Sequence, residues 1–133
     1  MVVDTSAPLA ICFDEPESDA FAAALADAER RCISTVSVFE GAMVVESRFG
    51  PAGVQRLNRL IEAHELDIRP FDADQLRAAR DAFLRYGKGR HPARLNLGDC
   101  CAYALAATIH EPLLYKGNDF QQTDIETALG SAE

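Results

Sequence analysis

The chain has 133 residues, of which 48% are apolar and 26% are charged. This length and composition favour one globular domain over residues 1–133 and exclude wholesale disorder. The formal net charge of −8 excludes a protein whose whole surface is basic and holds nucleic acid.

Apolar runs and helical periodicity alternate along the chain. In chain order, they predict a strand over 1–4, a helix over 17–30, a strand over 32–36, helices over 37–48 and 54–65, a strand over 66–71, helices over 73–86 and 98–110, and a strand over 112–116. Residues 124–129 fit either a short strand or a helical turn. Strands joined through helices favour an α/β sandwich with a mostly parallel central sheet.

The cysteines and the chain start indicate the compartment. Cys12, Cys32, Cys100 and Cys101 form no CxxC pair, so we expect small buried apolar side chains in a reducing environment. No apolar run approaches the roughly 18 residues of a membrane span. Asp4 stands where a secretory signal would carry basic charge, and we therefore expect a cytoplasmic protein.

Four acidic residues are expected at the carboxyl edge of the sheet, where ligands of parallel sheets gather: Asp4, Glu40, Asp99 and Asp119. Clustered carboxylates repel one another unless a hard cation such as Mg²⁺ or Mn²⁺ lies among them. Asp4 is the most telling, because a carboxylate that ends a buried strand is costly unless it is paired or bound to a cation. The chemistry that follows is metal-activated water attacking a phosphodiester.

The other three acids also have structural interpretations. Glu40 completes a capping box with Ser37. Asn96 fits the cap of the next helix, and Asp99 lies in the first turn, where the helix dipole favours negative charge. Asp119 fits a turn. Capping and metal binding are compatible, because a helix start fixes the backbone from which the carboxylate projects. The four acids at one edge together carry the hypothesis.

The sequence resembles PIN-domain ribonucleases and, more narrowly, the VapC-type toxins of toxin–antitoxin pairs. The resemblance rests on "VVDTSA" at 2–7, "STVSVFEGAMV" at 34–44, "LNLGDCCAYALA" at 95–106 and "LLYKGNDF" at 113–120. It implies a three-layer α/β/α sandwich and a Mg²⁺- or Mn²⁺-dependent endoribonuclease that cleaves structured RNA such as tRNA or rRNA. It also implies a homodimer and a VapB-type antitoxin that neutralises the enzyme.

The same resemblance implies roles for individual residues. Asp4 matches the first metal ligand of the family, Glu40 matches the second acid, and Asp99 matches the third acid, which is also a metal ligand. Ser6 matches the hydroxyl residue that supports the first acid, and Asn96 matches the polar residue shortly before the third acid. The fourth acid departs from the family pattern. Many members place it two residues before the "DF" pair, where this chain has Gly117, so Asp119 is the candidate and Asn118 a polar helper.

We expect the first and third acids to hold the ion directly, and the second and fourth to act through water or to orient the attacking water. Thr5 and Ser6 would donate hydrogen bonds to the Asp4 carboxylate. Lys116 and a basic segment with two glycines and a proline would receive RNA phosphates. The cations of this segment are Arg85, Lys88, Arg90, His91 and Arg94. The alternative is a merely solvated loop.

Three other functions fit parts of the pattern. A phosphatase of the haloacid-dehalogenase kind also ends its first strand on an aspartate, but it needs a second aspartate where this chain has Ser6. A catalytically silent module could accept a partner's arginine in the acidic pocket, and an antitoxin could inhibit the enzyme in the same way. A PIN nuclease that is not a toxin is the third.

The apolar stripes of the helices at 37–48 and 54–65 fit self-association, an antitoxin groove or core packing.

Overall fold

The computed structural model describes residues 1–129, so the last four residues of the expected domain over 1–133 lie outside the described part. Its centre is a sheet of four strands in the order β3-β2-β1-β4. The strands are β1 (Val2–Val3), β2 (Cys32–Ser34), β3 (Asp67–Arg69) and β4 (Leu113–Leu114). Every pairing between them is parallel, as the alternating pattern of the sequence predicted.

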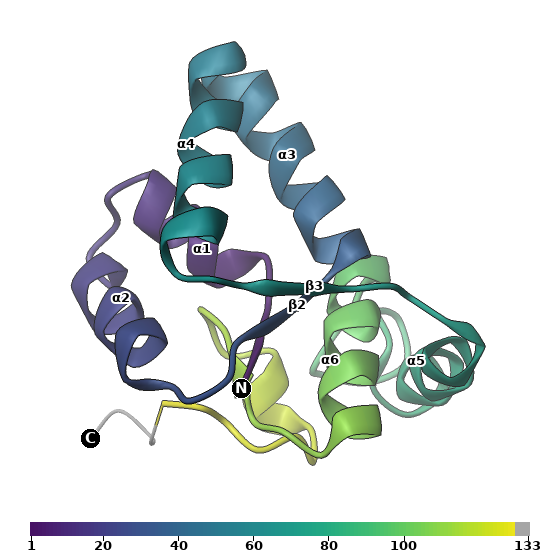
Figure 1. Cartoon of the computed structure of the whole chain (residues 1–133). Helices are drawn as coiled ribbons and strands as arrows, with labels where there is room; N and C mark the ends of the chain where they lie inside the picture. The colour runs from purple at the N-terminus through teal and green to yellow at the C-terminus, as the bar shows by residue number, and fades with distance from the viewer. Residues whose placement is uncertain (130–133) are drawn as a thin grey trace.

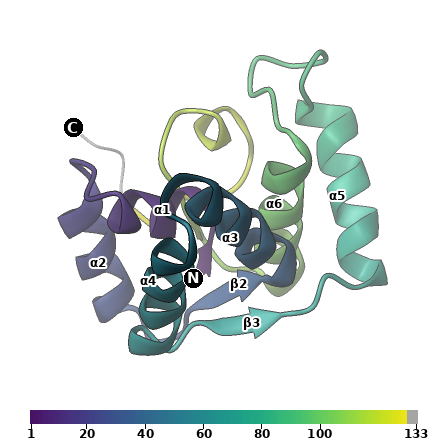
Figure 2. The same cartoon turned by 90° about the horizontal axis from the view of Figure 1, so that it is seen from above.

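Six α-helices and one 3₁₀ helix surround this sheet within residues 1–129 (Figures 1 and 2). They are α1 (Ser6–Cys12), α2 (Ser18–Asp27), α3 (Thr35–Phe49), α4 (Pro51–Ala63), α5 (Ala73–Tyr86), α6 (Leu97–Ile109) and η1 (Phe120–Gln122). In Figure 2, α5 and α6 lie on one side of the molecule, and α1, α2 and α4 lie on the other. No helix in the described part is both long and apolar enough to cross a membrane.

The two-residue alternation of the strands divides the core into two layers. Val2 of β1 packs in one cluster with α5 and α6, whereas Val3 packs in the other with α1, α2 and α4. Cys32 and Ile33 of β2 alternate in the same way. Both faces of β1, β2 and β4 are therefore covered, in line with their buried residues, whereas β3 at the end of the strand order is mostly exposed. This arrangement confirms the three-layer α/β/α sandwich. All four cysteines are buried, as predicted.

The structure departs from the predicted elements mainly at the start of α3, at the start of α4, which begins at Pro51 and not at 54, and at α1. Ser34 ends β2 and caps α3, because its side chain accepts a hydrogen bond of 3.1 Å from the Val36 amide. The predicted capping box of Ser37 and Glu40 is therefore wrong: Ser37 is buried inside α3, and Glu40 lies in the second turn. Helix α1 was not predicted, since it is short and has no side-chain cap.

Residues 124–129 resolve the remaining alternative in favour of extended chain. The Leu113 amide donates to the Glu126 carbonyl at 2.8 Å, and the Ala128 amide donates to the Leu113 carbonyl at 2.9 Å. Thr127 thus forms a single parallel bridge with β4.

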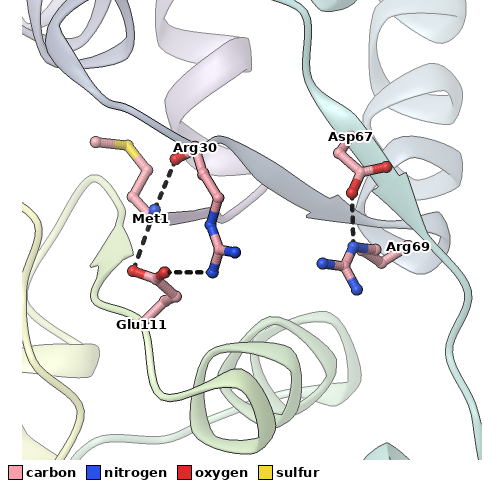
Figure 3. A network of polar contacts seen from close by, with 5 residues as sticks. All are labelled: Met1, Arg30, Asp67, Arg69 and Glu111. Carbon is pink, nitrogen blue, oxygen red and sulfur yellow. Dashed lines mark hydrogen bonds and ion pairs between the residues drawn. The ribbon is translucent and has the colours of Figure 1, made fainter.

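Polar contacts secure the edge at which the strands begin (Figure 3). The amino group of Met1 donates to the Arg30 carbonyl at 2.8 Å, and Arg30 pairs with Glu111 at 3.0 Å. On β3, the side chain of Arg69 pairs with that of Asp67 at 2.7 Å. These ion pairs lie at the beginnings of β1 and β4 and along the outer strand, so the opposite edge remains for the acidic residues.

The hairpin of α3 and α4 depends on a close approach at Gly53. A Cβ at this position would lie 2.5 Å from the Val45 carbonyl oxygen and 2.9 Å from the Phe49 Cβ. A Cβ at Gly41 of α3 would instead make ordinary contacts, at 3.5 Å from Leu57 and from Thr5.

We therefore expect Gly53→Ala to lower the free energy of unfolding by about 1–3 kcal/mol through overpacking, although alanine is the better helix former. Gly41→Ala is the matched control and should leave the free energy of unfolding unchanged or higher. Urea denaturation of both variants measures this difference. Equal effects of the two substitutions would contradict the close packing of α3 on α4.

Candidate active site

Asp4 lies directly after β1 and is buried, with only 5% of its surface exposed. Its backbone amide donates to the Leu114 carbonyl at 2.9 Å, which fixes the residue beside β4. The amide and the hydroxyl of Ser6 both donate to Asp4 Oδ2, at 3.0 and 2.5 Å. The Lys116 amide donates to the Ser6 hydroxyl oxygen at 2.9 Å, which leaves the hydroxyl proton for Asp4.

Thr5 does not support Asp4 in the way that the sequence suggested. Its hydroxyl donates to the Ser37 carbonyl at 3.3 Å instead. The predicted hydrogen bond to Asp4 is wrong because Thr5 faces α3, the helix that carries Glu40. Thr5 therefore joins the start of α1 to α3, and Ser6 alone of the two hydroxyl residues contacts the carboxylate.

Asn96 caps α6 as predicted, and Asp99 completes a capping box with it. The Asn96 side chain accepts from the Asp99 amide at 2.9 Å, and Asp99 Oδ2 accepts from the Asn96 amide at 3.0 Å. The box fixes the backbone of this helix start, from which the half-buried Asp99 carboxylate projects. The capping and the metal-binding interpretations of Asp99 are therefore compatible here.

Glu40 reaches the same helix start from α3. Its half-buried carboxylate lies directly against Gly98, the residue before Asp99. Asp119 lies in the loop between β4 and η1, and both Asp119 and its neighbour Asn118 are exposed. The acids thus come from four separate stretches of the chain.

The pKa values show that these carboxylates act on one another. The pKa of Asp4 is raised to about 7, chiefly by burial, with a contribution from the negative charges of Asp99 and Glu40 and against the hydrogen bonds from Ser6. Burial also raises the pKa of Asp99, and Asp119 and Glu40 add to this effect. Asp4, Glu40 and Asp99 therefore lie within electrostatic range of one another, and Asp119 lies within electrostatic range of Asp99.

The two aspartates present oxygens that suit a hard cation. The hydrogen bonds to Asp4 and Asp99 fall on Oδ2 in each case, so within the described residues each Oδ1 accepts no hydrogen bond. Carboxylate oxygens are the ligands that Mg²⁺ and Mn²⁺ prefer. Over residues 1–129, no group of three or more His, Cys, Asp or Glu side chains lies close enough together to hold a metal ion as the side chains stand. The chemistry of the two free carboxylate oxygens suits such an ion, and a complete ligand set would need the side chains to move closer together or water molecules to fill the remaining positions.

The predicted RNA-binding cations divide into two groups. Lys116 Nζ pairs with Glu15 at 3.0 Å and with Glu17 at 3.6 Å, and Arg85 pairs with Asp124 at 3.3 Å. These two side chains are therefore engaged in ion pairs in the structure. Of the other cations of the basic segment, Lys88, Arg90 and Arg94 are exposed, and His91 is half-buried and accepts a hydrogen bond from the Ala93 amide.

An apolar groove of about 620 Å³ lies between α5, the start of α6 and the first turn of α3. Its lining includes Val36, Phe71, Leu76, Phe83, Leu84 and Leu97, with Arg80 and Arg90 beside them. Further along α3, Phe39 and Met43 are exposed, whereas Leu57 and Leu60 of α4 are buried. Core packing therefore accounts for the stripe of α4, whereas these two apolar side chains of α3 are not covered by the rest of the described chain.

Sequence reasoning missed two features of the site. The hydrogen bond from the Lys116 amide to the Ser6 hydroxyl could not be predicted from the sequence, because a backbone contact depends on how β1 and β4 pair. Gly98 could have been noticed, because a glycine in the first turn of an otherwise regular helix is unfavourable without a packing reason.

Comparison with known proteins agrees with this geometry. A family model of the PIN domain matches residues 1–126. Ribonuclease VapC30 of Mycobacterium tuberculosis is 48% identical over 127 residues, which cover 96% of this chain and 97% of that protein. Ribonuclease VapC of Mycolicibacterium smegmatis is 49% identical over 125 residues, which cover 94% of this chain and 97% of that protein.

Two solved structures share the fold at low sequence identity. Mycobacterium tuberculosis VapC20, described as a sarcin-ricin loop cleaving toxin, has a TM-score of 0.76 and 13% identity over 93% of this chain and 95% of its own. A chain of a toxin–antitoxin complex from Klebsiella pneumoniae has a TM-score of 0.66 and 21% identity over 92% of each chain. With the family match over almost its whole length and relatives that are nearly half identical, the chain belongs to the PIN-domain family and, within it, to the VapC ribonucleases.

Proposed function

We propose that this VapC ribonuclease is the toxin of a type II toxin–antitoxin system and an endoribonuclease that requires Mg²⁺ or Mn²⁺. The observation that carries the proposal is the meeting of Asp4, Glu40 and Asp99 at one sheet edge, near enough that their charges interact. The names of the relatives, which are ribonucleases, support the activity. Family membership leaves the haloacid-dehalogenase alternative without support.

Asp4 and Asp99 would hold the ion through the oxygens that are free of hydrogen bonds. A bound divalent ion supplies a Lewis acid that polarises the phosphodiester and lowers the pKa of a water molecule. Ser6 keeps the Asp4 carboxylate aimed, because its amide and its hydroxyl both donate to the same oxygen. Glu40 and Asp119 complete the site as groups that contact water, orient it and accept its proton.

The substrate that we propose is structured RNA, of the class of tRNA or rRNA. The relative VapC20 is described as cleaving the sarcin-ricin loop, which is an RNA structure. The exposed cations Lys88, Arg90 and Arg94 supply positive charge on a chain of net charge −8. Phosphate contacts from such side chains position RNA without reading its sequence.

The protein partner that we propose is a VapB-type antitoxin, in line with the neighbour solved as a toxin–antitoxin complex. An arginine of the antitoxin could pair with the carboxylates of the acidic site.

The apolar groove and the exposed side chains of α3 also offer a surface to a second copy of this chain, and a homodimer in the cytoplasm is part of the proposal. A silent binding module is the alternative, and RNA cleavage by partner-free protein with Mn²⁺ separates the two.

Substitution of the direct ligands should abolish cleavage. We expect Asp4→Asn and Asp99→Asn to reduce Mn²⁺-dependent RNA cleavage by about 100-fold or more, because Lewis-acid stabilisation contributes several kcal/mol. Asp119→Asn should reduce it by only about 10-fold if this exposed acid acts through water. Asp27→Asn, an exposed acid at the end of α2, is the matched control and should keep full activity. Full activity of either ligand variant would refute the ligand assignment.

The buried charge of Asp4 should also destabilise the metal-free protein at high pH. Because the folded state holds the pKa of Asp4 at about 7, above its ordinary value of 3.8, the folded state binds the proton more tightly than the unfolded state. Stability should therefore fall as the pH rises from about 4 to about 7.

At pH 8, metal-free Asp4→Asn should be more stable than the metal-free wild type by up to about 4 kcal/mol, since one pKa unit corresponds to about 1.4 kcal/mol. The gap should narrow towards pH 4, and Mn²⁺ should raise the melting temperature of the wild type alone. Thermal denaturation at both pH values provides the measurement. If metal-free Asp4→Asn were less stable than the metal-free wild type at pH 8, the ionised Asp4 carboxylate would not destabilise the folded state, which contradicts this prediction.

A further inference from the structure

The Glu40 carboxylate lies so close to Gly98 that only glycine, which has no side chain, fits at position 98 without a clash. Gly98 is the second residue of α6 and is buried. A Cβ at this position would lie 2.6 Å from Glu40 Oε1, 2.7 Å from Glu40 Cδ and still nearer to Oε2. Ordinary contacts of a Cβ begin near 3.4 Å. The Glu40 carboxylate therefore occupies the volume that the side chain of any other residue at position 98 would fill.

Packing is what holds Glu40 in this place. Within the described residues, its carboxylate takes part in no hydrogen bond and no ion pair, unlike Asp4 and Asp99, which accept from Ser6 and Asn96. The start of a helix of 13 residues favours a negative charge, because its first amides are unpaired and the helix dipole is positive there. That attraction draws the carboxylate towards α6, and the missing side chain of Gly98 sets how closely it can approach.

We propose that Gly98 is a positioning residue for Glu40: its bare Cα seats the Glu40 carboxylate beside Asp99, at the orientation that the cleavage site needs. The inference rests on the proposed function, in which Glu40 is the second acid. Alanine would favour the helix at this position, so the glycine serves the site and not the stability of α6.

Gly98→Ala separates the two roles. The clash falls on the end of a flexible side chain, so we expect Glu40 to swing away while the fold is kept. The kcat of Mn²⁺-dependent RNA cleavage should fall at least tenfold with little change in KM, and the urea midpoint should stay near that of the wild type. Gly41→Ala, at the α3 glycine next to Glu40 with ordinary contacts, is the control; it should keep kcat and leave the midpoint unchanged or higher.

A double-mutant cycle with Glu40→Ala provides a readout that does not depend on activity. Without the Glu40 carboxylate, the methyl group that Gly98→Ala introduces meets no clash. Gly98→Ala should therefore raise the urea midpoint of metal-free Glu40→Ala although it does not raise that of the wild type. Wild-type kcat in Gly98→Ala, or equal midpoint shifts in both backgrounds, would overturn the positioning role alone. Full activity of Glu40→Ala would overturn the assigned role of Glu40, and the inference with it.

Discussion

The constraint on which this site depends is the concentration of negative charge at one edge of a buried sheet. Asp4 alone carries a substantial cost, because burial and the charges of Asp99 and Glu40 disfavour its ionised form. The fold opposes this cost with the two hydrogen bonds from Ser6 and with the parallel pairing of β1 and β4. The carboxylates are thus held within electrostatic range of one another.

Contacts elsewhere in the fold hold in place the helices and strands that carry these acids. The two apolar clusters fix the sheet between its helical layers, and the capping box of Asn96 and Asp99 fixes the start of α6. Thr5 joins α1 to α3, and the close approach of α3 and α4 at Gly53 supports the helix that carries Glu40. The ion pairs of Met1, Arg30 and Glu111 lie at the other edge, so they stabilise the fold without adding positive charge to the site.

The layers and the gathering of the acids could be predicted because they depend on local patterns. Apolar runs joined through helices favour a parallel sheet, and residues that follow parallel strands meet at one edge. The Asn96 cap and the position of Asp99 in the first turn of α6 were predictable for the same reason. The start of α3 was not, because Ser34, Thr35 and Ser37 all suit a helix start and tertiary packing chose among them. The hydrogen bond of Thr5, the pairing of Lys116 and the contact of Glu40 with Gly98 join segments that are distant in the sequence, which no local pattern encodes.

The most direct test of a shared ion site is a calorimetric titration of the metal-free wild-type protein with Mn²⁺ in buffers of different ionisation heat. The account predicts saturable binding accompanied by proton release near pH 6, where Asp4 is largely protonated, and little release at pH 8.5. The absence of binding heat at both pH values, in a protein whose fold is intact by circular dichroism, would contradict it.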